Sequence, residues 1–240
     1  SGLTEFTVLK SVLPAIQESH RLLSSNIATL SHSAVQFCAN LDPEAFSRVK
    51  SDWKKAMDSW SSLTAINFGP IDETNAVWRF QFWPDQINLV HRKFKARVKG
   101  RNKAIDAKSL SKASVAIQGL SALEYLLFDP QLISLKRYQS DPHLCDLLKN
   151  TAFNLRKEAQ RLNRTWQNDF PSRWLATRSN GKRSIEQFFS GLVMALGNIS
   201  KQKLGKPLGL TLDKQSDVTR SQVSIKSNPW QLESWRSQQS

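Results

Sequence analysis

The chain has 240 residues, 40% of them hydrophobic, which excludes a mainly disordered protein and allows one large helical domain or two smaller bundles. It has no apolar run of about 18 residues that could span a membrane. Its first residues lack the layout of a signal peptide, which is compatible with a mature chain whose leader has been removed. The formal net charge of +14 favours anionic partners in general.

Two long amphipathic helices are predicted at the start of the chain. Apolar residues three and four positions apart form one stripe over residues 13–37, and we expect Pro14 to bend or delay its first turns. Asp42 has the character of an N-cap with Pro43 in the first helical position, and a second stripe follows over residues 46–63. These two helices should pack as an antiparallel pair.

An aromatic segment over residues 78–85 predicts a short strand or a packed loop, after which Pro84 opens a third helix that ends near Gly100. Ile87, Val90, Phe94 and Val98 would form its buried stripe. The densest positive charge runs from Arg92 to Lys108, on the solvated face of this helix and the loop after it. A basic polyanion-binding module is one alternative function, but no base-reading motif accompanies the charge, so no specific nucleic acid is expected.

A fourth helix is predicted over residues 111–128 and a fifth over 140–166, the latter capped by Ser140 or Asp141 before Pro142. Five such helices indicate an up-and-down bundle over residues 1–170. Residues 171–240 would begin a second bundle, with a helix over 185–199, a long polar connection over 205–228 and a last helix that starts near Pro229. The expected fold class is therefore all-α, an up-and-down helical bundle followed by a second, smaller or incomplete helical bundle.

One segment of the fourth helix carries polar side chains among leucines. On a helix Gln118, Ser121 and Glu124 lie at nearby angles because they are three residues apart. Gly119 costs a helix about 1 kcal/mol relative to alanine, which indicates that something approaches the backbone there. The alternative is ordinary helix packing with Glu124 at the surface. No catalytic motif is evident elsewhere in the sequence.

Several motifs of this chain, in the same order, resemble those of the imelysin-like proteins, also called the M75 peptidase family. They are Phe68-Gly69-Pro70, Phe82-Trp83-Pro84-Asp85, the run over residues 114–129, the run over 203–209 and Glu233-Ser234-Trp235-Arg236-Ser237. The resemblance implies two helical bundles side by side, a periplasmic or outer-membrane lipoprotein setting and an association with iron uptake.

The signature of that family, Gly-x-His-x-x-Glu, maps onto Gly119, Ser121 and Glu124, so a serine stands where the presumed metal-ligating histidine would be. A hydroxyl is a poor ligand for a transition metal, and the cluster is better suited to hydrogen bonds. We therefore expect a non-catalytic cell-envelope protein, a binding or accessory component linked to iron or metal uptake. An M75-type metallopeptidase is the enzyme alternative. Iron or another divalent metal is a candidate ligand, and none is required.

The expected ligand site combines residues of both bundles. A buried Glu124 at their junction would need a cation, from Arg79, Arg236 or a bound metal, and Arg236 could also pair with Asp85. The expected partner is a small polar ligand or an envelope protein, with membrane anchoring through a removed lipidated N-terminus as a further option. The candidate ligand-binding residues are Gln118, Gly119, Ser121, Glu124, Asp85, Glu233, Ser234, Arg236 and Ser237.

The two cysteines are predicted to form a disulfide. Cys38 ends the first helix and Cys145 lies in the first turn of the fifth, and the envelope setting implied by the resemblance is oxidising. The alternative is two separate buried thiols.

Overall fold

The computed structural model describes residues 2–64, 76–83, 85, 87–99, 106–169, 171–172, 186, 190, 231 and 233–234. Every regular element in these ranges is helical, which confirms the all-α class. None of the helices described there is long and apolar enough to cross a membrane. Most of the helix expected over 185–199, the connection over 205–228 and most of the last helix lie outside the described residues, so the second bundle stays a prediction.

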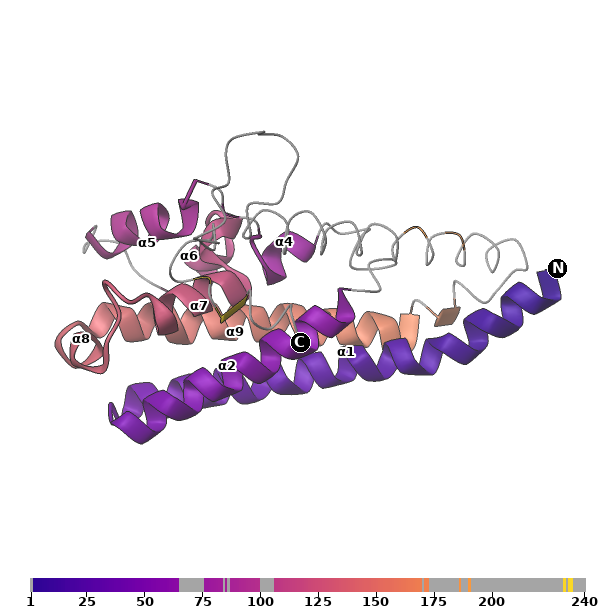
Figure 1. Cartoon of the computed structure of the whole chain (residues 1–240), viewed down its shortest axis with the longest axis horizontal. Coiled ribbons are helices and arrows are strands. Elements are labelled where there is room, and N and C mark those ends of the chain that lie inside the picture. Colours follow the sequence, from indigo (N-terminus) through magenta and orange to yellow (C-terminus); the bar gives the residue numbers. More distant parts are fainter. Residues whose placement is uncertain are drawn as a thin grey trace, which may run out of the picture.

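Three long helices form the frame of the molecule, namely α1 (Gly2–Ala39), α2 (Pro43–Leu63) and α9 (Pro142–Arg164). α1 packs along both of the others, and α2 runs back along it (Figure 1). Both predicted helix starts are confirmed, because Asp42 accepts a hydrogen bond from the Ala45 N–H (2.7 Å) and Asp141 accepts one from the His143 N–H (3.1 Å). Helix α1 begins well before its expected start and includes Pro14.

The predicted apolar stripes form the core between these helices. Ile27 and Phe37 of α1 and Trp53 and Trp60 of α2 are all completely buried, and each such side chain contributes about 1.5–3 kcal/mol to folding. The indole nitrogens find partners on neighbouring segments. Trp53 Nε1–H donates to the Leu120 carbonyl (3.0 Å), and Trp60 Nε1–H donates to Gln81 Oε1 (2.9 Å). Helix α2 is thereby tied to the two segments that build the candidate site.

The shorter elements are α4 (Val77–Phe80), α5 (Leu89–Lys99), α6 (Ala107–Ser111), the 3-10 turn η1 (Val115–Ile117), α7 (Gly119–Phe128), α8 (Leu135–Ser140) and the π-helical turn η2 (Thr165–Asp169). Helices α4, α5, α6 and α7 lie on the side of α9 away from the middle of α1 (Figure 1). Helix α7 is packed between α9 and α2, and η2 continues α9.

Three details of this region differ from the sequence-based expectation. The helix expected over residues 111–128 is broken into α6, η1 and α7, since Ser114 caps η1 and Gln118 has an extended backbone. The aromatic segment begins with the helical turn α4 and contains no strand in its described residues. Helix α5 starts at Leu89, beyond Pro84, so Ile87 precedes it and is 66% exposed where we expected it to be buried.

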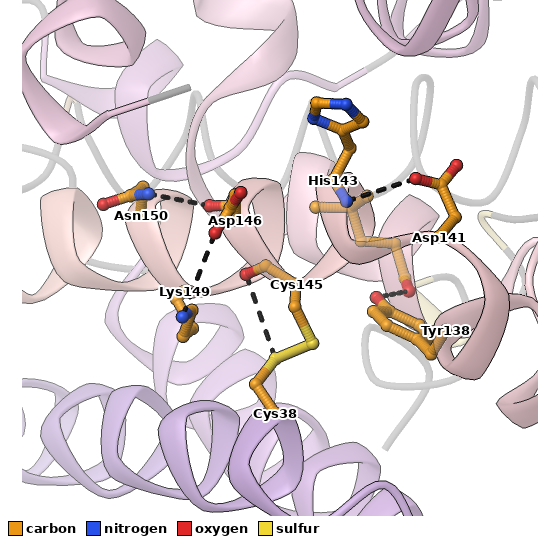
Figure 2. The surroundings of a disulfide bond; sticks show 9 residues. Cys38, Tyr138, Asp141, His143, Cys145, Asp146, Lys149 and Asn150 are labelled. Atoms are coloured by element: carbon orange, nitrogen blue, oxygen red, sulfur yellow. Dashed lines mark hydrogen bonds and ion pairs between the residues drawn. A yellow bond between two sulfur atoms is a disulfide. The ribbon is translucent and has the colours of Figure 1, made fainter. Parts of the chain in front are cut away.

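A disulfide joins Cys38, at the end of α1, to Cys145, in the first turns of α9 (Figure 2). Their Cα atoms are 5.6 Å apart, and 107 positions separate them in sequence. Closing a loop of about 100 residues stabilises a fold by about 4–5 kcal/mol in the chain-entropy account. Tyr138 lies beside the bond and donates to the Leu126 carbonyl (2.5 Å), so this end of the bundle is tied to α7 as well.

Candidate functional site

Gly119 fixes how α7 meets the aromatic segment. Its φ of +72° lies in the left-handed region that favours glycine. A Cβ atom at this position would lie 2.2 Å from the Arg79 carbonyl oxygen and 2.5 Å from that of Phe80. The close approach expected at Gly119 is therefore made by the backbone of α4, and Gly119 is the first residue of α7, where we expected it inside a longer helix.

Glu124 lies in the middle of α7 and has no exposed surface. Its Oε1 accepts a hydrogen bond from the backbone N–H of Ser234 (2.8 Å), and its Oε2 accepts one from the Ser234 hydroxyl. The Ser234 side chain is 1% exposed and also lies 3.8 Å from the sulfur of Met57 on α2. A residue 110 positions further along the chain thus covers the carboxyl group between α7 and α2.

Burial raises the pKa of Glu124 to about 8 from an ordinary value of 4.5. The two hydrogen bonds from Ser234 act in the opposite direction, since they favour the ionised form, but the loss of hydration outweighs them. The carboxylate of Glu233 adds to the increase. At neutral pH Glu124 is mainly the protonated acid, in which one carboxyl oxygen carries the proton and shares it with the Ser234 hydroxyl, so it does not require a cation to offset a buried charge.

The cation expected at Glu124 is not found among the described residues. Arg79 Nε lies 3.9 Å from Glu158 on α9, and Lys54 Nζ lies 3.5 Å from Glu233. Neither forms an ion pair with Glu124. Arg236 and Ser237, the other expected contributors, lie outside the described residues.

The other predicted site residues that the structure describes do not gather around Glu124. The Ser121 hydroxyl donates to the Phe82 carbonyl (3.1 Å) and fastens α7 to the aromatic segment. Asp85 accepts from the N–H groups of Leu89 (2.6 Å) and Val90 (2.9 Å), so it caps α5. Gln118 donates to the Ala113 carbonyl (2.8 Å), because its extended backbone directs it away from the helical face of Ser121 and Glu124.

Gln118 and Gly119 instead lie on a polar cavity of about 110 Å³ between α4, α6, α9 and the start of α7. Arg79, Thr151, Asn154, Lys157 and Glu158 also line it. No pattern in the sequence predicted this cavity. The one local signal for it is Thr151, a hydroxyl on the otherwise apolar buried stripe of α9, while the contributions of α4 and α6 depend on tertiary packing.

The family model Peptidase_M75, described as Imelysin, matches residues 15–240, nearly the whole length of the helical frame and the Gly119–Glu124 motif. The chain belongs to the imelysin family. This confirms the resemblance on which the expected fold was based. A search of curated protein sequences finds no match.

Two solved structures share the imelysin fold of this chain. An imelysin-like protein from Psychrobacter arcticum 273-4 superposes with a TM-score of 0.75 at 20% identity, over 88% of this chain and 65% of that one. A "putative iron-regulated protein A precursor" from Parabacteroides distasonis ATCC 8503 superposes with a TM-score of 0.72 at 15% identity, over 99% of this chain and 72% of that one. This chain spans less than two thirds of the Psychrobacter protein, and these identities establish the fold alone.

The described residues do not fit a metal ion at the imelysin motif. Both carboxyl oxygens of Glu124 are hydrogen-bonded to Ser234, and the Ser121 hydroxyl, where a histidine would stand, is engaged with a backbone carbonyl. Nowhere in the described part of the chain do three histidine, cysteine, aspartate or glutamate side chains gather as metal ligands would. The motif here serves to join α7, the aromatic segment and the Ser234 segment.

Proposed function

We propose that this imelysin-family protein is a non-catalytic binding component of the bacterial cell envelope that contributes to iron or metal uptake. Family membership supports the proposal, as does the name of the Parabacteroides neighbour, which describes that protein as iron-regulated and as a precursor. We further propose a location in the periplasm or at the outer membrane, with a lipid anchor as one means of attachment.

The hydrogen bonds between Glu124 and Ser234 are the observation that carries the non-catalytic part of the proposal. A metallopeptidase uses a metal-bound water together with a group that accepts a proton from it. At the family motif the carboxyl group is buried, protonated at neutral pH and covered by Ser234, and Ser121 is bound to Phe82. Glu124 and Ser121 are therefore engaged in holding the fold together, which favours a binding function over peptide hydrolysis.

The proposed partner is a small polar ligand or another protein of the envelope. The basic face of α5 supports at most weak binding to polyanions, because Arg92, Lys93 and Lys95 are exposed around the buried Val90 and Phe94, as on any amphipathic surface helix. Such contacts would weaken strongly with rising salt and carry no sequence selectivity.

A deletion of the gene in its bacterium, with uptake of radioactive iron measured under iron limitation, tests the proposal. We expect lower uptake in the deletion strain and recovery with the wild-type gene. The purified wild-type protein, incubated with iron, zinc or manganese, should show no metal-dependent cleavage of casein, with Glu124→Gln as the matched variant. Unchanged iron uptake would contradict the role in uptake, and cleavage that requires both a metal and Glu124 would contradict the non-catalytic assignment.

A further inference from the structure

The polar cavity on the α9 side of α7 has the size of a small-molecule site. A single water needs about 10–15 Å³ of such space, so a volume of about 110 Å³ accommodates a molecule of several non-hydrogen atoms. Its walls come from α4, α6, η1, the start of α7 and α9. The cavity is therefore a built feature of the fold.

An unpartnered hydroxyl lies in the wall of this cavity. Thr151 is 2% exposed, and its Oγ1 has no hydrogen-bond partner among the described residues. A buried hydroxyl without a partner costs about 1–3 kcal/mol, so such a group is retained at a cost to stability unless something binds it. A ligand atom in the adjacent space could supply the missing hydrogen bond.

The charged groups of the wall favour an anion. Arg79 and Lys157 contribute two positive charges and Glu158 one negative charge. Glu158 is already paired with Arg161 (2.8 Å) in addition to its contact with Arg79 at 3.9 Å. The lining therefore carries an excess of one positive charge, from a guanidinium on α4 and an ammonium group on α9, and this charge is suited to a single carboxylate.

The amide groups of the wall present acceptors as well. Asn154 donates through Nδ2 to the Ala107 carbonyl (2.8 Å), and Gln118 donates through Nε2 to the Ala113 carbonyl (2.8 Å). With an N–H of each nitrogen engaged in this way, the oxygen of each amide serves as an acceptor for a ligand. A matching ligand therefore carries a hydrogen-bond donor besides its carboxylate.

We propose that this cavity binds a small carboxylate with a hydrogen-bond donor on the adjacent carbon, that is, an α-hydroxy or α-amino acid. The carboxylate lies toward Arg79 and Lys157, and the donor lies toward the amide oxygens of Gln118 and Asn154. The Thr151 hydroxyl completes the set. This site is separate from the Glu124–Ser234 contact and does not depend on the proposed role in iron uptake.

Three compounds of nearly equal size test the ligand class, namely lactate, alanine and propionate, titrated into the full chain and followed by NMR of the backbone amides. We expect saturable shifts at residues 151–158 with lactate, alanine or both, and binding of propionate at least about tenfold weaker, the effect of one hydrogen bond to an unpaired polar group. Preference between lactate and alanine separates the hydroxy acid from the amino acid. Equal binding of all three, or no saturable binding, would overturn the proposal.

Two variants with matched controls assign the binding to this cavity. Thr151→Val removes the hydroxyl at constant shape and should weaken binding of the preferred compound about tenfold, whereas Thr29→Val, at an exposed threonine of α1, should leave it unchanged. Lys157→Gln should weaken binding, and Lys149→Gln on the same helix should not. Full affinity in Thr151→Val together with Lys157→Gln would show that the compound binds elsewhere.

Discussion

Residues 118–124 contribute to two polar regions of the molecule, the Glu124–Ser234 contact and the cavity beside Gln118. The two regions differ in whether their buried polar groups have hydrogen-bond partners. At Glu124 the chain supplies every partner itself, through the backbone and side chain of Ser234. In the cavity beside Gln118 the Thr151 hydroxyl is buried and has no partner in the part of the chain that the structure describes, and charged groups line an open space. A satisfied buried group stabilises the fold, while an unsatisfied one beside a cavity indicates a ligand. The family motif therefore marks a structural junction, and the binding site lies next to it.

Gly119 lines the cavity and begins the helix that carries Glu124, so its replacement should have the largest effect. Gly119→Ala would place a Cβ within 2.2 Å of the Arg79 carbonyl at a positive φ, and we expect it to lower the free energy of unfolding by about 3 kcal/mol or more. Ser111→Ala, at the exposed end of α6, is the control and should change it by less than about 0.5 kcal/mol. Urea denaturation followed by tryptophan fluorescence measures both. An alanine variant as stable as the wild type would show that α4 does not press on α7.

Ser234→Ala should disturb the Glu124 contact alone. It leaves a buried carboxyl group with one hydrogen bond fewer, which costs about 1–3 kcal/mol in the free energy of unfolding. The neighbouring Glu233→Gln removes only a partly exposed ion pair with Lys54, worth at most about 1 kcal/mol. Equal effects of the two substitutions would mean that Ser234 does not cover Glu124 in solution. Ligand binding in the cavity should be unaffected by either.

Thr151→Val should have the smallest effect on stability, and in the opposite direction. Replacing an unpartnered buried hydroxyl by a methyl group of the same shape should raise the free energy of unfolding by up to about 1 kcal/mol. Thermal unfolding of the variant beside the wild type, in the absence of added ligand, measures the change. A clear loss of stability would show that Thr151 has a hydrogen-bond partner in the folded protein.

The sequence predicted those features that depend on neighbouring residues. The caps Asp42-Pro43 and Asp141-Pro142 and the apolar stripe of α1 are local signals, and all three are present in the structure. The prediction of a single helix over residues 111–128 was wrong, because Ser114 caps η1 and Gln118 adopts an extended backbone before α7. That break also separates Gln118 from the face of Ser121 and Glu124.

The partners of the polar residues were harder to predict, since each depends on tertiary packing. From the family resemblance we expected the segment over residues 233–237 to contact Glu124 and to supply a cation. In the structure the contact is made by Ser234. Nothing in the sequence indicated that Arg79 lies beside Glu158, 79 positions away, or that Asp85 caps a helix starting at Leu89. Charge complementarity alone cannot choose among partners at such separations.

The protonation state of Glu124 affects how stability changes with pH, but a second titrating group, His20, contributes to the same pH dependence. His20 is buried against Trp166, with ring centroids 4.8 Å apart, and burial lowers its pKa to about 4 from 6.5. The unfolded chain binds this proton more readily, so His20 makes the protein less stable as the pH falls from 6.5 to 4. Glu124 acts oppositely. Its folded pKa of about 8 lies above the ordinary 4.5, so its contribution is present below pH 4.5 and is lost as the pH rises toward 8.

The difference in free energy of unfolding between the wild type and Glu124→Gln, measured from pH 4 to pH 9, tests the central claim most directly. His20 cancels in this difference, and glutamine mimics the protonated acid without titrating. We expect the stability of the wild type relative to the variant to fall between pH 4.5 and pH 8, by a few kcal/mol for a pKa increase of this size, and to level off above. A difference that stays constant or rises with pH would mean that Glu124 is ionised in the folded protein, with a cation or metal at the motif.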